Sequence, residues 1–345
     1  MTPEIFGFHE NASITKDQTA TNVILSSMLT TNRSAGAADE EEESTAGGDT
    51  TTTKAAATEK PKSQDEMTYE VASMNLSKIP PLFDMEYAAL RYPVDFSESM
   101  NTVVCQELER FNGLTAIITK SLKDVMDAIK GIIVMSKQLE NVASSLFFGI
   151  VPSMWMDASY PSLKPLGSYS SDLLQRLEFL NLWLNGSSPP IYWISGFYFT
   201  QAFLTGTLQN FARRYKIPID HVAYDFEIMP LSYDQYTSKP EDGAYIHGLF
   251  FDGARWDAEA QVLTDSKPKE LFSEAPVVWL KPADKSTIIE YPHYTCPVYK
   301  TSARWGVLST TGASTNYVMN ILIPADRIED VWIEAGVAML TQLDN

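Results

Sequence analysis

The chain has 345 residues, which is enough for about two domains that each bury a sizeable core. Its formal net charge is −18 and its pI is about 4.6, so its surface repels phosphate backbones and we expect no nucleic-acid partner. No apolar run is long enough to span a bilayer, and the first residues lack the basic and apolar regions of a signal peptide, so we expect no membrane partner. Two cysteines, Cys105 and Cys296, do not make a disulfide framework and indicate a reducing compartment.

Residues 1–31 carry a short helical pattern, with Ala20, Val23, Ile24 and Met28 on one face. Residues 32–66 differ sharply in composition. They hold an acidic run at 39–43 and four successive threonines, and they have almost no large apolar side chain. Such a segment cannot bury enough surface to offset its ordering entropy, so we predict a disordered acidic insert. A solvated spacer is favoured over an interaction tail.

Residues 67–218 are predicted to be helical. A short helix at 67–74 should end before the proline pair at 80–81. A capping box at 95–98, Asp-Phe-Ser-Glu, then opens a long amphipathic pattern that reaches Leu139.

Glycines at 113 and 131 weaken the case for one unbroken helix, and a bent helix or a helical hairpin is equally possible for that long pattern. Two more helices are predicted, at 170–185 and 200–216.

Residues 219–345 change to short apolar runs separated by Pro, Gly, Asp and Ser, which is typical of strands and turns. The runs lie at 221–229, 244–251, 276–280, 294–299, 317–323 and 336–343. We predict an α+β fold, in which an N-terminal helical segment is followed by a small antiparallel β-barrel or sandwich.

Three features of these runs carry further expectations. Gly248, inside its run, predicts a bulge or a close backbone approach. Pro297 predicts an edge strand or a bulge. The final run is apolar at successive positions, as expected for a strand that is buried on both faces.

The segment GLTAIITKS at 113–121 superficially resembles a phosphate-binding loop. That loop needs a second glycine directly before its lysine, so that backbone N–H groups can surround the phosphate. Here Thr119 occupies that position before Lys120, and the helical period continues through it. We therefore predict a helix with no nucleotide site, and no cofactor.

Other candidate chemistry is equally sparse. His9, His221, His247 and His293 are scattered, and no metal site is expected. Cys296 and His293 would point to opposite faces of an extended strand, which argues against a catalytic pair. Asp252 and Asp257 could serve acid–base chemistry, but a turn built on Asp-Gly explains them more simply. We predict no catalytic, cofactor or metal residues.

Several segments, in order, resemble the C-terminal region of a dynein heavy chain, the ATP-driven microtubule motor. The segments are PSMW at 152–155, WISGFYFTQAFLTG at 193–206, GAYIHGLFFDGARWD at 243–257, KPK at 267–269, PVVWL at 276–280 and YTCPVYKT at 294–301. The stretch QNFARRYKIPID at 209–220 is more similar to axonemal than to cytoplasmic heavy chains. The likeness covers the whole sequence except the insert.

The resemblance implies four parts. They are the end of the sixth AAA+ module at 1–31, the disordered acidic insert at 32–66, the helical part of a C-terminal domain at 67–218 and its antiparallel β-barrel part at 219–345. It also implies that ATP is bound and hydrolysed in modules outside this sequence. The domain would then be no enzyme itself, but would brace the AAA+ ring of the same heavy chain and modulate minus-end-directed motility.

The implied partners are that ring, other dynein subunits through the complex, and the microtubule only through a stalk that this sequence lacks. The implied location is the cytoplasm and cytoskeleton, in the axoneme of a cilium or flagellum. One alternative is an independent protein-binding module with a helical hairpin and a β-barrel. Another is an enzyme that uses the mouth of the β part.

Overall fold

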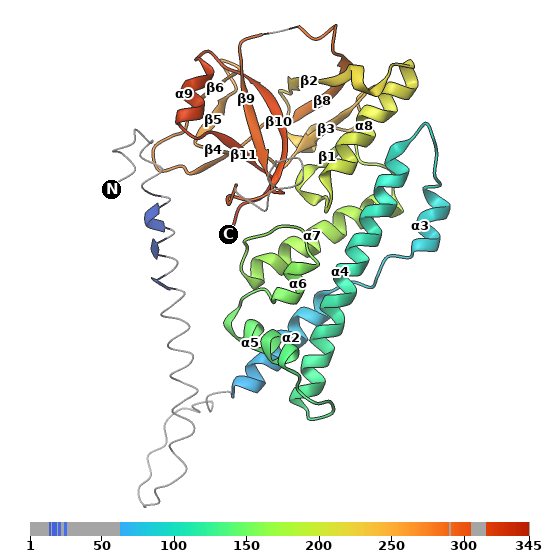
Figure 1. The fold of residues 1–345 in the computed structure, drawn as a ribbon, viewed down its shortest axis with the longest axis vertical. Helices are drawn as coiled ribbons and strands as arrows, with labels where there is room; N and C mark the ends of the chain where they lie inside the picture. Colours follow the sequence, from blue (N-terminus) through green and yellow to red (C-terminus); the bar gives the residue numbers. More distant parts are fainter. Residues whose placement is uncertain are drawn as a thin grey trace, which may run out of the picture.

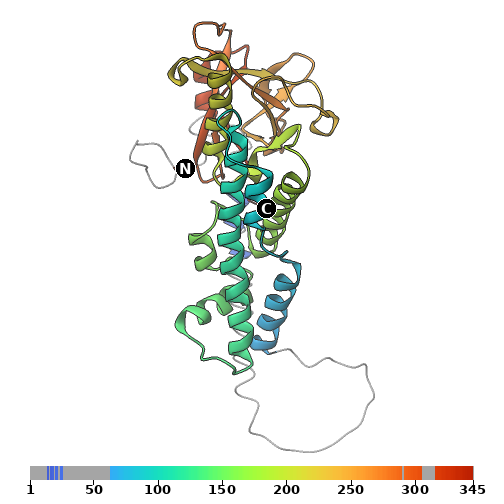
Figure 2. The same ribbon diagram turned by 90° about the vertical axis from the view of Figure 1, so that its right-hand side faces the viewer.

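The structure, a computed structural model, describes residues 63–289, 291–304 and 315–344, with a few positions between 14 and 25. Those few positions are helical, in agreement with the pattern predicted there, and residues 32–62 of the predicted insert lie outside the described residues. An elongated helical part carries a β part at one end (Figures 1 and 2). No helix of the described residues is both long and apolar enough to cross a membrane.

The helical part is built around one long helix, α4. Its helices are α2 (Gln64–Lys78), α3 (Met85–Arg91), α4 (Ser99–Ile129), α5 (Lys137–Phe148), α6 (Ser153–Asp157), α7 (Leu166–Asn185) and α8 (Thr200–Tyr215). With 31 residues, α4 is about 46 Å long. Its buried side chains recur three and four positions apart, from Met100 to Val125, so the predicted amphipathic period is confirmed.

The long pattern resolves into a helical hairpin, one of the three alternatives that the sequence left open. The helix α4 runs through Gly113 without a break and ends at Ile129. Gly131 then adopts a left-handed conformation (φ 73°), which suits a residue without Cβ, and α5 returns alongside α2 and α4.

The start of the helical part departs from the sequence prediction at two points. A capping box between Ser63 and Glu66 starts α2 at Gln64, so the last residues assigned to the insert are its first turn. The capping box predicted at 95–98 is wrong. Asp95 accepts hydrogen bonds from the backbone N and Oγ of Ser97 (both 2.7 Å), and the Glu98 carboxylate instead caps α4.

The β part contains eleven strands and the short helix α9 (Glu329–Glu334) among the described residues. The strands are β1 (Ile191–Trp193), β2 (Val222–Ile228), β3 (Ala244–His247), β4 (Phe250–Asp252), β5 (Ala254–Asp257), β6 (Val262–Asp265), β7 (Phe272–Glu274), β8 (Val278–Asp284), β9 (His293–Tyr299), β10 (Tyr317–Pro324) and β11 (Ala338–Leu340). Short 3₁₀ turns precede α8 (η2, Ile194–Gly196), β2 (η3, Ile219–His221) and β3 (η4, Tyr233–Gln235).

The strands form three open sheets, with the orders β1-β3-β8-β2, β10-β9-β11-β4-β7 and β5-β6. None of these sheets closes on itself within the described ranges, so the arrangement is sandwich-like and the barrel alternative is not what forms. The two larger sheets are mixed and not purely antiparallel, because β1 pairs with β3 and β11 pairs with β9 in parallel, whereas β5 and β6 are antiparallel.

The expectation for Pro297 is wrong, whereas that for Gly248 is confirmed. Pro297 lies in β9, which sits between β10 and β11, and the register irregularity falls in β10 instead. Only Val298 and Tyr299 of β9 pair with β11, so the missing N–H of Pro297 lies outside that ladder. At Gly248 (φ 86°) a Cβ would lie 2.5 Å from Cδ1 of Trp193.

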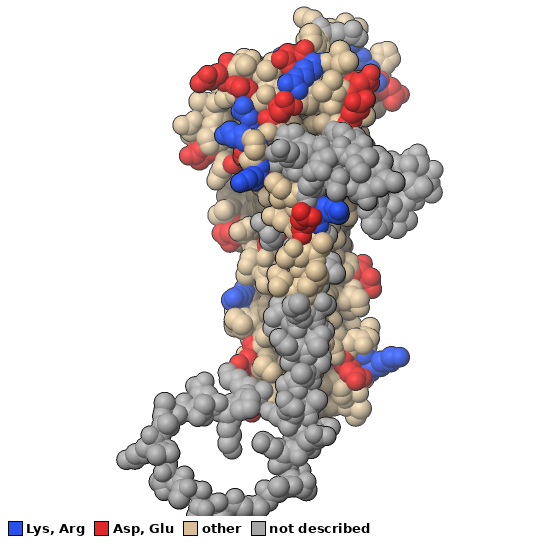
Figure 3. Space-filling view, turned by 90° about the vertical axis from the view of Figure 1, so that its left-hand side faces the viewer, with Lys and Arg blue, Asp and Glu red and all other residues tan. Residues whose placement is uncertain are grey.

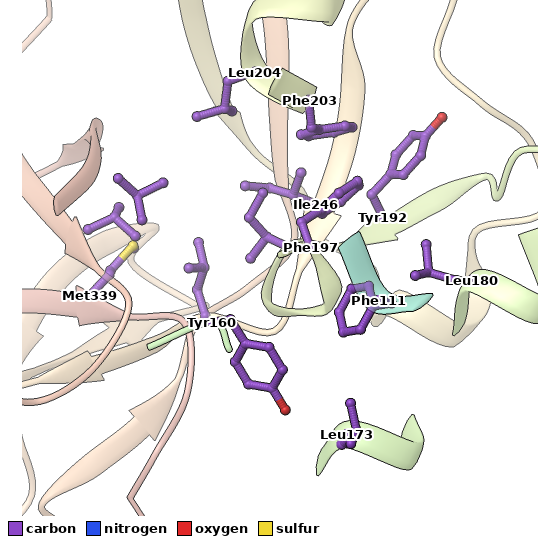
Figure 4. Close-up of a cluster of buried hydrophobic side chains, with 14 of the residues drawn as sticks. Phe111, Tyr160, Leu173, Leu180, Tyr192, Phe197, Phe203, Leu204, Ile246 and Met339 are labelled. Atoms are coloured by element: carbon purple, nitrogen blue, oxygen red, sulfur yellow. The ribbon is translucent and has the colours of Figure 1, made fainter. Parts of the chain in front are cut away.

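One continuous hydrophobic core joins the two parts. Figure 4 shows side chains of this core: Phe111, Tyr160 and Leu173 of the helical part belong to the same cluster as Ile246 and Met339 of the β part. The described helices and sheets therefore share one hydrophobic core.

Candidate functional site

The residues singled out for possible chemistry are not brought together. The segment 113–121 lies in the middle of α4, and so the helical interpretation of it is confirmed. Cys296 is buried on β9, where burial raises the pKa of its thiol, and His293 lies on the opposite face of the strand. No group of three or more His, Cys, Asp or Glu side chains that could hold a metal ion occurs among the described residues.

The two aspartates of the 243–257 segment have separate partners. The Asp257 carboxylate accepts backbone N–H groups of Glu259 (3.0 Å) and Ala260 (3.1 Å), and these bonds lower its pKa. It is therefore a turn carboxylate, but in a turn where alanine and not the expected glycine follows it. Asp252 instead forms an ion pair with Arg304 (2.5 Å), which also donates to the carbonyl of Gly336 (2.6 Å) and so ties β4 to the segment before β11.

The most organised polar cluster lies between the helices and the sheets, around Arg176. Arg176 on α7 is only 2% exposed, and its Nε donates to Oδ2 of Asp172 one turn earlier (2.7 Å). The Tyr160 hydroxyl donates to the same carboxylate oxygen (2.8 Å), and the guanidinium lies 3.9 Å from the Tyr160 ring centroid. A charge this deeply buried is tolerated because it is paired and hydrogen-bonded.

The same guanidinium reaches two other segments of the protein. Its Nη1 donates to the carbonyl of Ser195 in η2, and its Nη2 lies 3.5 Å from Oε1 of Gln342, which follows β11. Gln342 in turn donates to the carbonyl of Pro161 (2.5 Å). We call Tyr160, Asp172, Arg176, Ser195 and Gln342 the Arg176 joint, because they connect α7, the segment before α8 and the C-terminal segment.

A second buried charge fastens α4 to the start of α8. Glu107 is fully buried, and its carboxylate accepts the backbone N–H groups of Tyr198 (2.5 Å) and Phe199 (3.1 Å) and the guanidinium of Arg110 (3.1 Å). The N-cap residue of α8, Phe199, makes no side-chain hydrogen bond to the first turn of the helix. Glu107 instead fixes the backbone that leads into α8, because it accepts the N–H groups of the N-cap residue and of the residue before it. Burial raises the pKa of Glu107 despite these hydrogen bonds.

Sequence reasoning missed both of these buried charges. Each lies on the apolar face of its helix: Glu107 falls between Val104 and Leu108, and Asp172 and Arg176 keep the spacing of Leu173 and Leu177. A charged residue on the apolar face of a predicted helix indicates a buried ion pair or hydrogen-bond network, because buried charges need partners. The cluster can hold elements together, and it has none of the geometry of a nucleophile with an adjacent base.

His247 on β3 is expected to make the stability of the β part depend on pH. Its ring stacks on Tyr233, with centroids 4.6 Å apart, and burial lowers its pKa to about 4. In the unfolded protein the His247 imidazole binds a proton near pH 6.5, whereas in the folded protein it does so only near pH 4. The folded state therefore becomes less stable as the pH falls from 6.5 to 4. At pH 5 we expect a loss of about 1–2 kcal/mol from this group.

Thermal melting between pH 7 and 5 checks this prediction. His247→Phe should flatten the pH dependence, whereas His221→Phe, at an exposed position, should not change it. Parallel curves for His247→Phe and the parent protein would contradict the assignment.

The comparisons with known proteins agree with one another. The family described as the C-terminal domain of the dynein heavy chain matches residues 18–341. Dynein axonemal heavy chain 12 of Homo sapiens and dynein axonemal heavy chain 3 of Mus musculus are each 48% identical over 99% of this chain, and dynein axonemal heavy chain 1 of Homo sapiens is 44% identical over 99%. The chain spans only 8–10% of the length of these relatives. By this match over nearly its whole length, the chain belongs to the family of C-terminal domains of dynein heavy chains.

Proposed function

We propose that this chain is the C-terminal cap of an axonemal dynein heavy chain, which braces the AAA+ ring and modulates ATP-driven, minus-end-directed movement along microtubules. The observation that carries the proposal is the 48% identity to axonemal heavy chains over 99% of the chain. ATP would be bound and hydrolysed elsewhere in the heavy chain, and the cap would act by mechanical contact alone. Its place would be the axoneme of a cilium or flagellum.

Two features of the fold support a mechanical role. The Arg176 joint and the hydrogen bonds of Glu107 each connect segments distant in sequence. The Arg176 joint also links the helix α7 to the segment that follows β11. A body tied in this way can transmit a load between its ends without its elements sliding. Modules joined by flexible linkers could not transmit such a load.

The net negative charge of the chain disfavours direct binding to the microtubule, whose surface is also acidic. The sequence has 44 acidic against 26 basic residues. Lys and Arg side chains lie among Asp and Glu side chains over the β part on the face that Figure 3 shows. We therefore propose that microtubule contact is made by another part of the heavy chain, and that the partners of this cap are the ring and, through the complex, other dynein subunits.

The test compares a motor heavy chain that contains this chain with a shortened version that lacks residues 63–345 of the present numbering. We expect the shortened motor to keep nucleotide binding but to move microtubules at a changed speed in a gliding assay, with a changed microtubule-stimulated ATPase rate. Unchanged speed and ATPase rate would contradict the bracing role. Tight binding of a soluble partner by the cap alone would favour the independent-module alternative.

A further inference from the structure

The loop between α4 and α5 exposes four consecutive apolar residues, which we call the apolar tip. They are Ile132 (68% exposed), Ile133 (38%), Val134 (90%) and Met135 (39%). Single exposed apolar side chains are ordinary on a protein surface, but a contiguous exposed run is typical of an interaction site.

The apolar tip is held in place by the helices on both sides. The backbone N–H of Ile132 donates to the carbonyl of Asp127 (2.9 Å), which closes the end of α4. Ser136 caps α5 by accepting the N–H of Leu139 (3.3 Å). The tip therefore stands as a short, ordered turn at the end of the helical part that lies farthest from the strands (Figures 1 and 2).

The polypeptide enters the domain beside this tip. Tyr69 in the first half of α2 and Ile129 at the end of α4 line the same surface hollow. Lys130 Nζ lies 4.9 Å from the centroid of the Tyr69 ring. Whatever precedes Ser63 therefore arrives at the end of the helical part that carries the tip.

The length of the relatives indicates which part of the protein precedes Ser63 and so lies near the apolar tip. The matched region is the C-terminal domain of heavy chains in which it makes up 8–10% of the length, so most of such a heavy chain lies N-terminal to it. A segment tethered next to a surface meets it at a high effective concentration, which favours docking even when the contact is small.

We propose that the apolar tip docks into an apolar hollow on the part of the heavy chain that directly precedes this domain. This inference rests on the proposed function and adds the surface through which the cap is held. Because the tip itself carries no charge, its partner surface should be apolar, and the contact should change little with salt.

The protein offers a matched control for this proposal. Leu90 (83% exposed) and Val94 (88%) are equally exposed apolar residues. They precede the start of α4, whereas the tip follows its end, so the two sites are separated by the length of that helix.

The experiment places a photo-reactive amino acid at position 134 or at position 94 of a motor heavy chain and maps the cross-linked peptides. Position 134 should cross-link within the same chain to residues before 63, with the same yield in low and high salt, and position 94 should not reach those residues. Cross-links from position 134 only to a second copy, or none at all, would overturn the proposal.

A substitution supplies the second readout. Val134→Asp should speed hydrogen exchange in the tip and in the cross-linked segment, by about tenfold if the contact loses about 1.4 kcal/mol. Val94→Asp should leave both unchanged. Normal exchange in Val134→Asp, or a failed cross-link in a motor whose motility still depends on residues 63–345, would reject the tip while leaving the proposed function standing.

Discussion

Ending the protein after Ala335 is expected to unfold the β part. The removed strand β11 lies inside its sheet, between β9 and β4, and Ala338, Met339 and Leu340 are all fully buried. Burying one large apolar side chain stabilises a protein by about 1.5–3 kcal/mol, so losing Met339, Leu340 and the buried Val337 costs about 5–9 kcal/mol. That loss is comparable with the whole stability of a typical domain.

Polar contacts add to this loss. Truncation removes the carbonyl that accepts the buried Tyr294 hydroxyl (2.7 Å) and the N–H of Thr341 that donates to Tyr299 (2.9 Å). It also leaves the facing edges of β4 and β9 unpaired, and exposed edges promote aggregation.

Circular dichroism and thermal melting of the truncated and full-length proteins measure the effect. Removing only the last two residues is the control, since it leaves β11 whole and, of the described residues, deletes only Asp344, which accepts a hydrogen bond from Ser302. We expect the control to melt close to the parent and the long truncation to lose its β signal. If the long truncation kept that signal and melted within a few degrees of the parent, β11 would be peripheral.

The positions of the helices and strands along the chain could be predicted from the sequence better than the pairing of the strands in the sheets. Helical periods are local, so α4, α7 and α8 could be predicted from spacing. The glycines at 113 and 131 could not decide between an unbroken helix, a bent helix and the hairpin that forms, because only the one at 131 ends a helix. The seven-residue helix α3 is too short to show a period, and it was missed. The last strand was expected to be buried on both faces, and this is confirmed.

Sheet topology, by contrast, depends on contacts between distant segments. Nothing in the run at 336–343 indicates that β11 inserts between β9 and β4, or that it lies parallel to β9. Pro297 predicted an edge strand because proline cannot donate a hydrogen bond to a neighbouring strand. The sequence does not show that β11 pairs only with the next two residues of β9, which leaves Pro297 outside that pairing. Non-local pairing is decided by the assembled core, and local patterns carry little of it.

Replacing Arg176 by methionine is the second change with a large expected effect. The substitution keeps much of the side chain's apolar stem but leaves the Asp172 carboxylate, 8% exposed, without its ionic partner. Removing one partner of a buried pair costs about 3–5 kcal/mol. For a protein of this size the melting temperature should fall by about 5–8 °C.

Two further variants separate the buried charge from the general loss of an arginine. Arg327→Met breaks the exposed pair with Asp265, whose two bonds are both 2.9 Å, and should cost less than about 1 kcal/mol. In Arg176→Met with Asp172→Leu no charge is left unpaired, so most of the lost stability should return, because replacing both partners of a buried pair by apolar residues is often neutral. A double variant as unstable as Arg176→Met would show that the bonds from Arg176 to Ser195 and Gln342, and not its pairing with Asp172, stabilise the joint.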